Sequence, residues 1–456
     1  MKNAIKGIMA MSLAFVLTAC GGGNKTDAPA DSKETGDGAN TEVTETAEVN
    51  EDISGKLSVQ VEEAWLPHYE KAAERVKEKY PNAEIEFKTI GAFDHLDIID
   101  QTDATNEDVA DLFAIPADRL YGLYGNDILA AVDSQKLQKE IGGWDNFDDG
   151  IGGNFNIDGE YFAFPYNIES LITYVNTANA EEKGINPDDP IEIDDSKDES
   201  TVLFPLFDAW YGVAATNSSN IELLGKGEDG ALFTDMTKEF SELEEEKQAT
   251  FKSLYEYWKK HNEAGTPLFD PDAGWAYIDD TFTTGNGGVA RIGGAWDAAT
   301  ISEQAGEGNL KMYPIGHITM AGKPLAHWQG GWGLSMNARI EGDEAKTAIA
   351  EEMIKEVVNP EYAVDLFKAT GKILENVEAK TYEDSDLPDS DKEIISATIE
   401  SYNNSPARPL FREWGDVWDT WKNAVLSWNS TKPANEEEAY NQLKSSFESM
   451  MANLNQ

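Results

Sequence analysis

The chain has 456 residues, and its 85 acidic side chains outnumber the 36 basic ones, which gives a formal net charge of −49 at pH 7. Such an acidic surface is a poor partner for nucleic acid, because phosphate binding depends on lysine and arginine. The single cysteine, Cys20, has no second cysteine with which to form a disulfide bond within the chain.

Residues 1–19 have the pattern of a lipoprotein signal peptide. Two lysines precede an apolar run, Ile8–Leu17, that is too short to span a bilayer but suits the apolar region of a secretory signal. The tetrapeptide Leu17-Thr18-Ala19-Cys20 resembles a bacterial lipobox, which implies that Cys20 is S-acylated and becomes the first residue of the mature protein. The alternative is an ordinary signal peptide that happens to contain a cysteine.

Residues 20–52 contain glycine, alanine, serine, threonine, asparagine and acidic residues without apolar periodicity. Such a segment cannot bury enough surface to offset the entropy of ordering, so we expect a disordered tether. Two or more acyl chains on Cys20 would anchor the tether stably in lipid. We therefore expect an extracytoplasmic protein that is lipid-anchored to the cell membrane and exposed at the cell surface.

The folded body begins with the pattern of a β-α-β unit. Residues 56–61 alternate apolar and polar side chains, residues 66–80 repeat apolar side chains at helical spacing, and residues 83–90 alternate again. Residues 109–116 form a nearly continuous apolar run of the kind found in buried strands. This order favours a largely parallel sheet and an α/β fold.

Later segments have the same mixed character. Helical faces are predicted around residues 251–264 and 345–353 and over 360–371, a short strand lies between glycine turns at 286–294, and the last 40 residues have a helical composition. Roughly 400 residues remain after the signal peptide and tether, which suggests two domains.

No motif for catalysis is found. None of the five histidines stands in a metal-ligand spacing, and there is no nucleophile elbow or phosphate-binding loop. We therefore predict a protein that is not an enzyme and that holds no cofactor or metal. The acid-rich segments 187–200 and 382–393 lack the pattern of a calcium-binding EF-hand and are interpreted as solvated loops, with calcium binding as the open alternative.

Four stretches place aromatic side chains beside polar ones, at residues 114–124, 161–177, 291–301 and 408–425. A sugar ring has an apolar face, which tryptophan and tyrosine can cover, and an edge of hydroxyl groups, which carboxylates, amides and guanidinium groups can bind. The alternative for any single aromatic residue is packing in the core.

The sequence DGEYFAFPYNIESLITYVNTANAEEKGI at residues 158–185 resembles the segment of family 1 extracellular solute-binding proteins in which a strand crosses between two lobes. Four further segments follow the order of the maltodextrin-binding branch, at residues 110–133, 282–301, 328–342 and 407–425. The resemblance spans about residues 56–450. It implies a two-lobed periplasmic-binding-protein-like fold, in which each lobe is a sheet flanked by helices. It also implies that the protein delivers a ligand to an ABC importer.

The resemblance also implies the domain boundaries. The N-lobe is expected to contain residues 53–167 and 330–374, and the C-lobe residues 168–329 and 375–456. The chain is expected to cross between the lobes near Tyr166–Ser170 and near Trp328–Gly333.

Five site residues are carried over from motifs of the branch. Asp118 and Arg119 match an Asp-Arg pair that binds sugar hydroxyls, although a salt bridge within the loop is the alternative. Glu169 matches a hydroxyl acceptor, and Trp296 and Trp418 match stacking platforms.

Four more site residues are expected on weaker grounds. Asp297 adjoins Trp296 and would bind ligand or cap the following helix. Phe207 falls where a stacking tyrosine is expected. Ile115 replaces a cleft tryptophan of the best-known maltose binder, so a stacking wall would come from Trp65, Trp332 or the alternative Trp328.

Together these features predict a monomeric receptor that captures malto-oligosaccharides or other α-glucan fragments. Its partners would be the oligosaccharide, the membrane subunits of an ABC permease, and membrane lipid through Cys20. Two alternatives stay open. The first is a receptor of the same fold for a polyamine or another cation, against which Arg119 argues, and the second is a surface glycoside hydrolase.

Overall fold

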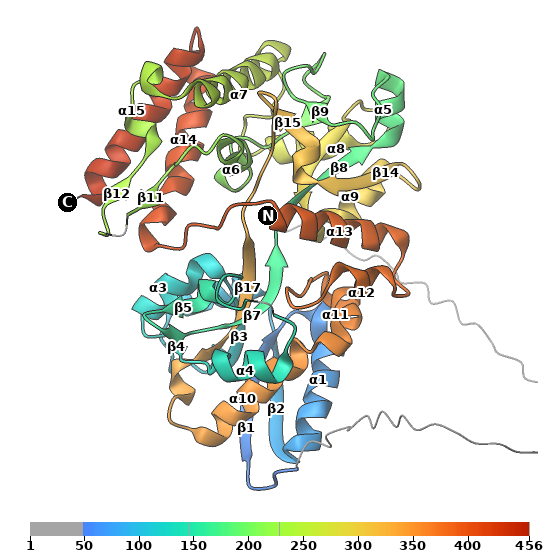
Figure 1. Cartoon of the computed structure of the whole chain (residues 1–456), viewed down its shortest axis with the longest axis vertical. Helices are drawn as coiled ribbons and strands as arrows, with labels where there is room; N and C mark the ends of the chain where they lie inside the picture. The colour runs from blue at the N-terminus through green and yellow to red at the C-terminus, as the bar shows by residue number, and fades with distance from the viewer. Residues whose placement is uncertain (1–48, 145, 228, 456) are drawn as a thin grey trace, which may run out of the picture. The chain divides into compact units, whose positions relative to one another are not determined.

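The computed structural model describes residues 49–144, 146–227 and 229–455 (Figure 1). The expected signal peptide, the acylation of Cys20 and the tether up to residue 48 lie outside the described residues. None of the described helices is both long enough and apolar enough to cross a membrane.

The expected β-α-β unit begins the fold. Strand β1 (Ser54–Val61) leads into α1 (Leu66–Lys79), and β2 (Asn82–Thr89) returns parallel to β1. The buried run that follows forms β3 (Leu112–Pro116), which is also parallel to β1. The period-two and helical patterns therefore identified these elements correctly, because each element buries one face in the core beneath the sheet.

Two long-range antiparallel strands complete the first sheet. Strand β17 (Gly330–Asn337) lies between β3 and β4 (Leu129–Ala130), and β7 (Phe164–Glu169) also pairs with β17. The sheet order is β2-β1-β3-β17-β4, with β7 attached to β17. We call this sheet and the helices that pack on it the N-lobe. Strands β7 and β17 run side by side where the chain passes between the two parts of the fold in Figure 1.

A second sheet forms around β8 (Leu171–Asn176), whose six residues are all buried. Strands β13 (Ala290–Gly294) and β14 (Leu310–Pro314) flank β8 in antiparallel pairing, and β10 (Val202–Leu203) joins β13 at the edge. We call this sheet and its helices the C-lobe. Because β8 follows β7 after a single residue, Ser170, the chain passes directly from the first sheet to the second.

The remaining helices divide between the lobes. Those of the N-lobe are α2 (Ala92–Gln101), α3 (Leu120–Gly125), α4 (Ser134–Ile141), α10 (Glu344–Val357), α11 (Ala363–Thr370) and α12 (Ala379–Glu383). Those of the C-lobe are α5 (Thr177–Lys183), α6 (Ala209–Ser218), α7 (Glu245–Ala264), α8 (Gly274–Phe282), α9 (Ala298–Ala305), α13 (Asp389–Asn403), α14 (Asp416–Thr431) and α15 (Glu436–Leu454).

Short strands and single 3-10 turns fill the connections. The strands are β5 (Asn156–Ile157), β6 (Glu160–Tyr161), β9 (Ile191–Glu192), β11 (Gly225–Lys226), β12 (Leu232–Phe233), β15 (Ile318–Met320) and β16 (Lys323–Pro324). The turns that matter for the site are η1 (Glu63–Trp65), η2 (Ala117–Arg119), η6 (Ala295–Asp297) and η10 (Arg412–Gly415).

The acid-rich segment 382–393 is less irregular than expected. Its second half begins α13, and Asp389 and Asp391 lie in the first turn of that helix. Acidic side chains near a helix N-terminus interact favourably with the helix dipole, so these acids fit a helix start as well as a solvated loop. The chain crosses between the lobes for the third time here, from α12 of the N-lobe to α13 of the C-lobe.

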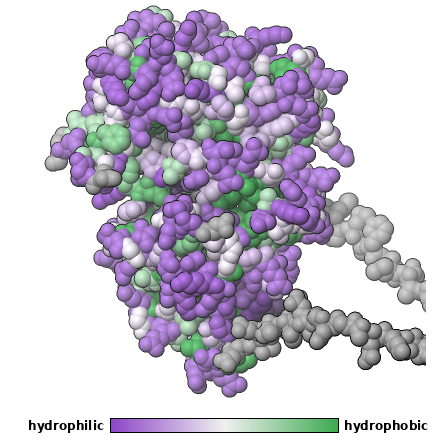
Figure 2. Space-filling model, viewed as in Figure 1, coloured by the Kyte–Doolittle hydropathy of each residue, from purple (hydrophilic) through white to green (hydrophobic). Residues whose placement is uncertain are grey.

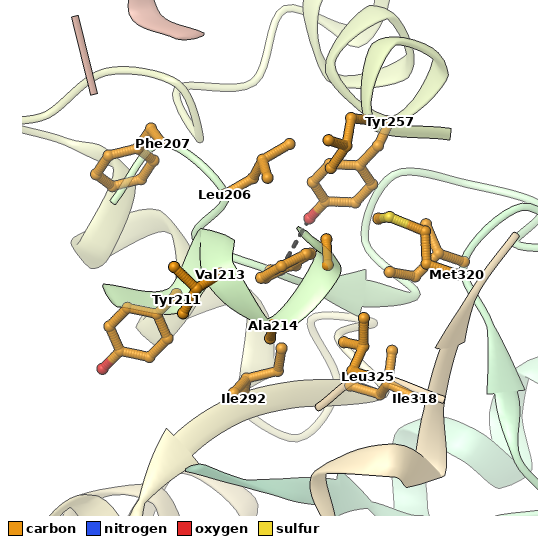
Figure 3. Packing of buried hydrophobic residues seen from close by; sticks show 14 of the residues in the cluster. Leu206, Phe207, Tyr211, Val213, Ala214, Tyr257, Ile292, Ile318, Met320 and Leu325 are labelled. Carbon is orange, nitrogen blue, oxygen red and sulfur yellow. Dashed lines mark hydrogen bonds between the residues drawn. The ribbon is translucent and has the colours of Figure 1, made fainter. Parts of the chain in front are cut away.

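Each lobe has its own hydrophobic core. The C-lobe core gathers side chains from β8, β13, α6, α7 and α14, and Figure 3 shows Leu206, Ile292 and Met320 packing around α6. The hydroxyl of Tyr257 accepts a hydrogen bond from the Phe204 N–H at 2.8 Å and donates one to the Val202 carbonyl at 2.9 Å.

The N-lobe core also takes side chains from residues 377–387, which the expected boundary placed in the C-lobe. The lobe boundaries therefore stay a prediction.

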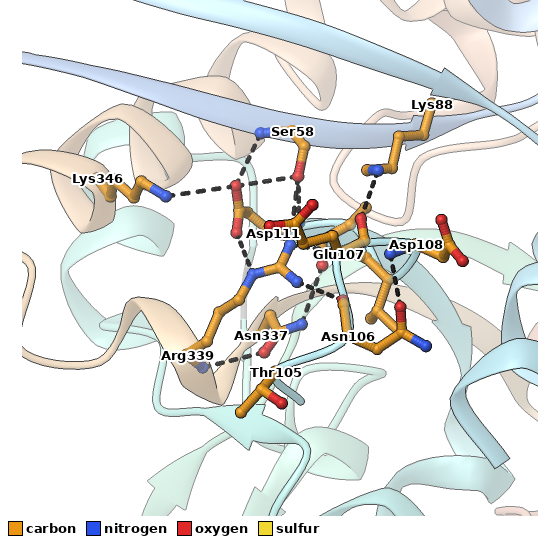
Figure 4. Close-up of polar contacts among 12 residues, drawn as sticks. Ser58, Lys88, Thr105, Asn106, Glu107, Asp108, Asp111, Asn337, Arg339 and Lys346 are labelled. Atoms are coloured by element: carbon orange, nitrogen blue, oxygen red, sulfur yellow. Dashed lines mark hydrogen bonds and ion pairs between the residues drawn. The ribbon is translucent and has the colours of Figure 1, made fainter. Parts of the chain in front are cut away.

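A buried carboxylate ties the N-lobe sheet together (Figure 4). Asp111, directly before β3, accepts hydrogen bonds from the Ser58 N–H at 2.9 Å and from Arg339 Nε at 2.6 Å. Arg339 also donates to the carbonyl of Asn106 at 2.7 Å. Burial alone would raise the pKa of Asp111, but these donors hold the pKa below its ordinary value.

We expect Asp111→Asn to lower the free energy of unfolding by about 3 kcal/mol, because removing one partner of a buried ion pair typically costs about 3–5 kcal/mol. Since the pKa of Asp111 is lowered by folding, its stabilising contribution should be lost as the pH falls below the unfolded value of about 3.9. Urea unfolding at several pH values checks both effects. Asp108→Asn, at an exposed position of the same loop, is the control. Equal stability of the two variants at neutral pH would contradict the prediction.

Candidate functional site

A cavity of ≈ 640 Å³ lies between the two lobes. Trp65, Asp118 and Trp332 line it from the N-lobe, and Trp210, Trp296 and Trp418 line it from the C-lobe. The surface in Figure 2 is mostly hydrophilic, and hydrophobic residues show mainly in the band where the two lobes meet. We call this cavity the cleft.

The structure brings most of the sequence-predicted site residues together in the cleft. Its lining includes Asp118, Arg119, Glu169, Trp296, Trp418, Trp65 and Trp332. These residues come from segments up to about 350 positions apart in the chain, which the pairing of β7 with β17 and the packing of α6 and α14 bring close. Their roles toward a ligand stay predictions.

Phe207 is not part of the cleft lining. Its side chain is only 2% exposed and belongs to the C-lobe core, where its ring packs against Trp275 with the centroids 5.9 Å apart. The cleft aromatics from this segment are instead Trp210 and Tyr211. Asp208 caps α6, because its Oδ1 accepts a hydrogen bond from the Trp210 N–H at 2.9 Å. The turn formed in this way directs the next residues toward the cleft.

Asp297 also lies outside the cleft lining. Its Oδ2 accepts a hydrogen bond from the Gly294 N–H at 3.1 Å, so the carboxylate fixes the turn that presents Trp296. Burial raises the pKa of Asp297, while this hydrogen bond opposes the shift. Asp297 is the N-cap residue of α9, but its side chain makes no capping hydrogen bond to that helix, so neither of the two expected roles is the one observed.

Trp328 and Ile115 lie behind the cleft. Trp328 is 2% exposed and packs edge-on against Trp414 and Trp418, with centroids 4.9 and 5.9 Å apart. Ile115 is fully buried in the core beneath β3. Neither residue therefore supplies a stacking wall.

Asp118 and Arg119 do not pair with each other. Arg119 forms an ion pair with Asp100 on α2, and Asp118 Oδ2 lies 2.8 Å from Nη2 of Arg408. Because each residue has another partner, the alternative of a salt bridge within the loop is not realised. The Asp118–Arg408 pair spans the cleft, because η2 belongs to the N-lobe and Arg408 precedes α14 of the C-lobe.

Arg408 is a site residue that sequence reasoning missed. Its side chain is 4% exposed, and its guanidinium lies 4.9 Å from the ring centroid of Trp210 and 5.5 Å from that of Trp328. Such stacking on aromatic faces is favourable for a desolvated arginine. The sequence feature that could have identified Arg408 as a site residue is its position at the start of the late aromatic segment 408–425.

Glu169 lies at the end of β7, inside the cleft. Its Oε1 accepts a hydrogen bond from Trp332 Nε1 at 3.3 Å. Burial raises the pKa of Glu169, and the positive charges of Lys372 and Arg408 oppose that rise. A partly desolvated carboxylate with unused lone pairs is a strong acceptor for hydroxyl groups.

Lys372 is a second residue that the sequence did not reveal. Its ammonium donates to Asn167 Oδ1 at 3.2 Å and lies over the rings of Trp65, Tyr166 and Trp332. Burial lowers its pKa to about 8, although the carboxylates of Glu169 and Glu62 partly counter this effect. A single lysine after the glycine that ends a helix carries no sequence signal of such a role.

The aromatic side chains of the cleft differ in exposure. Trp65 and Trp332 are 7% and 6% exposed, and Lys372 covers both rings, whereas Trp296 is 52% exposed. Phe93 on α2 is 64% exposed and contacts the ring of Trp332 with centroids 5.1 Å apart. Phe93 and Trp296 thus offer open faces from opposite lobes.

Metal binding has little support in this region. Among residues 49–144, 146–227 and 229–455, no three histidine, cysteine, aspartate or glutamate side chains gather closely enough to hold a metal ion. Three of the charged cleft residues take part in ion pairs of opposite charge, Asp118 with Arg408 and Arg119 with Asp100.

We expect the Asp118–Arg408 pair to couple the lobes energetically. In a double-mutant cycle of Asp118→Asn and Arg408→Gln, the coupling in unfolding free energy should be about 1–2 kcal/mol, because Arg408 is almost fully desolvated. The exposed pair Lys226–Glu413, 3.4 Å apart, is the matched control and should give less than about 0.5 kcal/mol. Additive effects of the two cleft substitutions would refute the coupling.

Comparison with solved structures shows what this fold is similar to. The maltose-binding periplasmic protein MalE from Listeria monocytogenes, in complex with maltose, matches with a TM-score of 0.68 and 18% identity over 86% of this chain and 97% of that chain. MalX from Streptococcus pneumoniae, in complex with maltopentaose, matches with a TM-score of 0.65 and 20% identity over 86% and 99%. The GacH receptor of Streptomyces glaucescens, studied with acarbose, gives 0.60 and 14% over 88% and 99%.

At these identities the similarity concerns the fold, and it confirms the expected two-lobed α/β architecture. A comparison with curated protein sequences returned no match. The family model of the bacterial extracellular solute-binding proteins matches residues 71–394, which is more than half of the chain. The chain therefore belongs to the bacterial extracellular solute-binding protein family.

Proposed function

We propose that the protein captures malto-oligosaccharides or related α-glucan fragments in the cleft and delivers them to an ABC importer. The observation that carries this proposal is the pair of open aromatic faces, Phe93 and Trp296, on opposite lobes of one cavity. Aromatic rings can cover the apolar faces of sugar rings, and the carboxylates of Asp118 and Glu169 can accept bonds from their hydroxyls. The solved relatives that bind maltose and maltopentaose support the same ligand class.

The proposed mechanism is capture without chemistry. The lobes are joined through β7, β17 and the passage between α12 and α13, so the loops at these crossings can act as hinges. Closure would remove water from the cleft and strengthen its hydrogen bonds. The closed lobes would then present a surface that the permease recognises. No covalent step or cofactor enters this mechanism.

We further propose that the receptor is a lipid-anchored monomer. Acylation of Cys20 would hold it at the membrane, and the tether of residues 20–52 would let the folded body reach the permease. Tethering raises the concentration of the receptor near its permease, so capture and delivery would become more efficient without any new contact.

The sugar-binding proposal is tested by titration calorimetry of a protein that begins after Cys20, with maltotriose as the probe. We expect saturable binding, and Trp296→Ala should weaken it at least about tenfold, which corresponds to about 1.4 kcal/mol of lost stacking. Phe233→Ala is the matched control, because Phe233 is also 52% exposed but lies outside the cleft lining.

Absence of binding to maltotriose and to longer maltodextrins would refute the ligand class. The sugar recovered from the calorimeter cell should be intact maltotriose. Shorter sugars in that sample would instead indicate the glycoside hydrolase alternative, which needs two carboxyl groups facing each other across the bound sugar.

The anchor is tested in bacterial cells that express the full chain. The protein should incorporate radioactive palmitate and partition with membranes, and Cys20→Ser should abolish both, because Cys20 is the single thiol of the chain. Ala19→Ser, which leaves the thiol in place, is the control. A palmitate-free protein that still fractionates with the membrane would point to an uncleaved signal peptide instead.

A further inference from the structure

Lys372 reaches the cleft because of the turn that ends α11. Gly371 has a φ of 69°, a left-handed conformation that favours glycine and stops the helix. The chain then runs beside β7, where the Ile168 N–H donates to the Ile373 carbonyl at 2.9 Å. This pairing fixes the backbone on both sides of Lys372 and directs its side chain into the cavity.

The ammonium of Lys372 lies within a cage of aromatic rings. Its Nζ is 4.7 Å from the ring centroid of Trp65, 4.9 Å from that of Tyr166 and 5.1 Å from that of Trp332. The rings come from η1, β7 and β17, so three separate elements converge on one charge. A cation within about 6 Å of such rings is attracted by their electron-rich faces, which is also how proteins recognise ammonium ligands.

Carboxylates complete the cage without neutralising the lysine directly. Glu169 and Glu62 line the same cavity and attract the ammonium at longer range. Within the described part of the chain, no carboxylate lies within 4.0 Å of Lys372 Nζ, and Asn167 Oδ1 is its one hydrogen-bond acceptor. Because an ammonium carries three donors, two N–H groups remain available to a ligand.

The charges that line the cleft balance one another. The acidic side chains are Glu62, Asp118 and Glu169, and the basic ones are Arg119, Lys372 and Arg408. This balance contrasts with the net charge of −49 for the whole chain. Without Lys372, the cage would hold three aromatic faces beside two carboxylates, which is the chemistry of a site for an organic cation.

We propose that Lys372 sets the charge class of the ligand, by filling a cage that would otherwise accept a cationic ligand and by offering its remaining N–H donors to hydroxyl oxygens of a neutral one. The exclusion of a cationic ligand rests on the cage alone. The donation to hydroxyl oxygens rests on the proposed function, since it takes the neutral ligand to be a sugar. Lys372 thereby also argues against the polyamine alternative.

The cage is tested by calorimetry with tetramethylammonium chloride as the probe. The wild-type protein should show no saturable binding, whereas Lys372→Ala should bind the probe saturably, because truncation to a methyl group vacates the cage and leaves its carboxylates in place. Lys368→Ala is the matched control: this lysine lies on α11, just before the turn that carries Lys372, and pairs with Asp386, away from the cleft. Circular dichroism melts establish that each variant is folded.

The donor role is tested with maltotriose and the wild-type protein over a range of pH. Burial lowers the pKa of Lys372 to about 8, and the groups that face it are Glu62, Glu169 and the neutral phenol of Tyr166. Affinity for maltotriose should therefore fall as the pH rises through about 8. Lys372→Arg should make this profile flat, because a guanidinium stays charged.

The outcomes separate this inference from the proposed function. If Lys372→Ala binds tetramethylammonium but no variant binds maltotriose, the cage stands and the sugar assignment fails. If a folded Lys372→Ala does not bind tetramethylammonium, or if the wild type binds it equally well, the cage inference is overturned. If Lys372→Ala does not fold, the pH profile of the wild type decides, and an unchanged affinity above pH 8 overturns the donor role.

Discussion

The antiparallel pairing of β7 (Phe164–Glu169) with β17 (Gly330–Asn337) is the constraint on which the cleft depends. Strand β7 leads out of the N-lobe into the C-lobe, and β17 leads back. Their register therefore fixes where Glu169 and Trp332 stand relative to the aromatic residues of the C-lobe. The pairing tolerates little bulk. A Cβ on Gly333 would lie 2.7 Å from both Ala163 and the ring of Phe155, and one on Gly331 would overlap Ile151. The cleft therefore depends on glycine at these positions, because only glycine lets the two strands pack this closely.

The electrostatics of the cleft follow from that packing. Once the crossing strands are buried, the charged groups on the segments beside them lose water and need partners, because an unpaired charge in a low dielectric is costly. Arg408 finds Asp118 and a tryptophan face, while Lys372 finds Asn167 and three aromatic rings. These pairs leave the open aromatic faces and the remaining lone pairs of Glu169 for a ligand. This arrangement underlies our proposal that the ligand is polar and neutral.

Sequence reasoning predicted the scaffold well and the site in part. The resemblance placed a crossing near Tyr166–Ser170, and it identified Trp296 by a glycine turn and Trp418 by the late aromatic segment; both tryptophans line the cleft. It was wrong about Phe207, because this residue ends a buried run before α6, whereas the cleft residues Trp210 and Tyr211 lie in the first turn of that helix. The motif alone does not reveal where the buried run ends. It missed Lys372 and Arg408, because single basic residues in loops have no pattern that distinguishes them from solvated ones.

The sequence by itself determined the α/β class, the β-α-β start, the order of the crossings and the family-level fold, because these depend on periodicity and on motif order along the chain. Only the tertiary structure decided which charges pair, which aromatic faces stay open and what fills the cage of Trp65, Tyr166 and Trp332. Those features arise between residues hundreds of positions apart. Their distances are set by strand register and helix packing, which local sequence patterns do not encode.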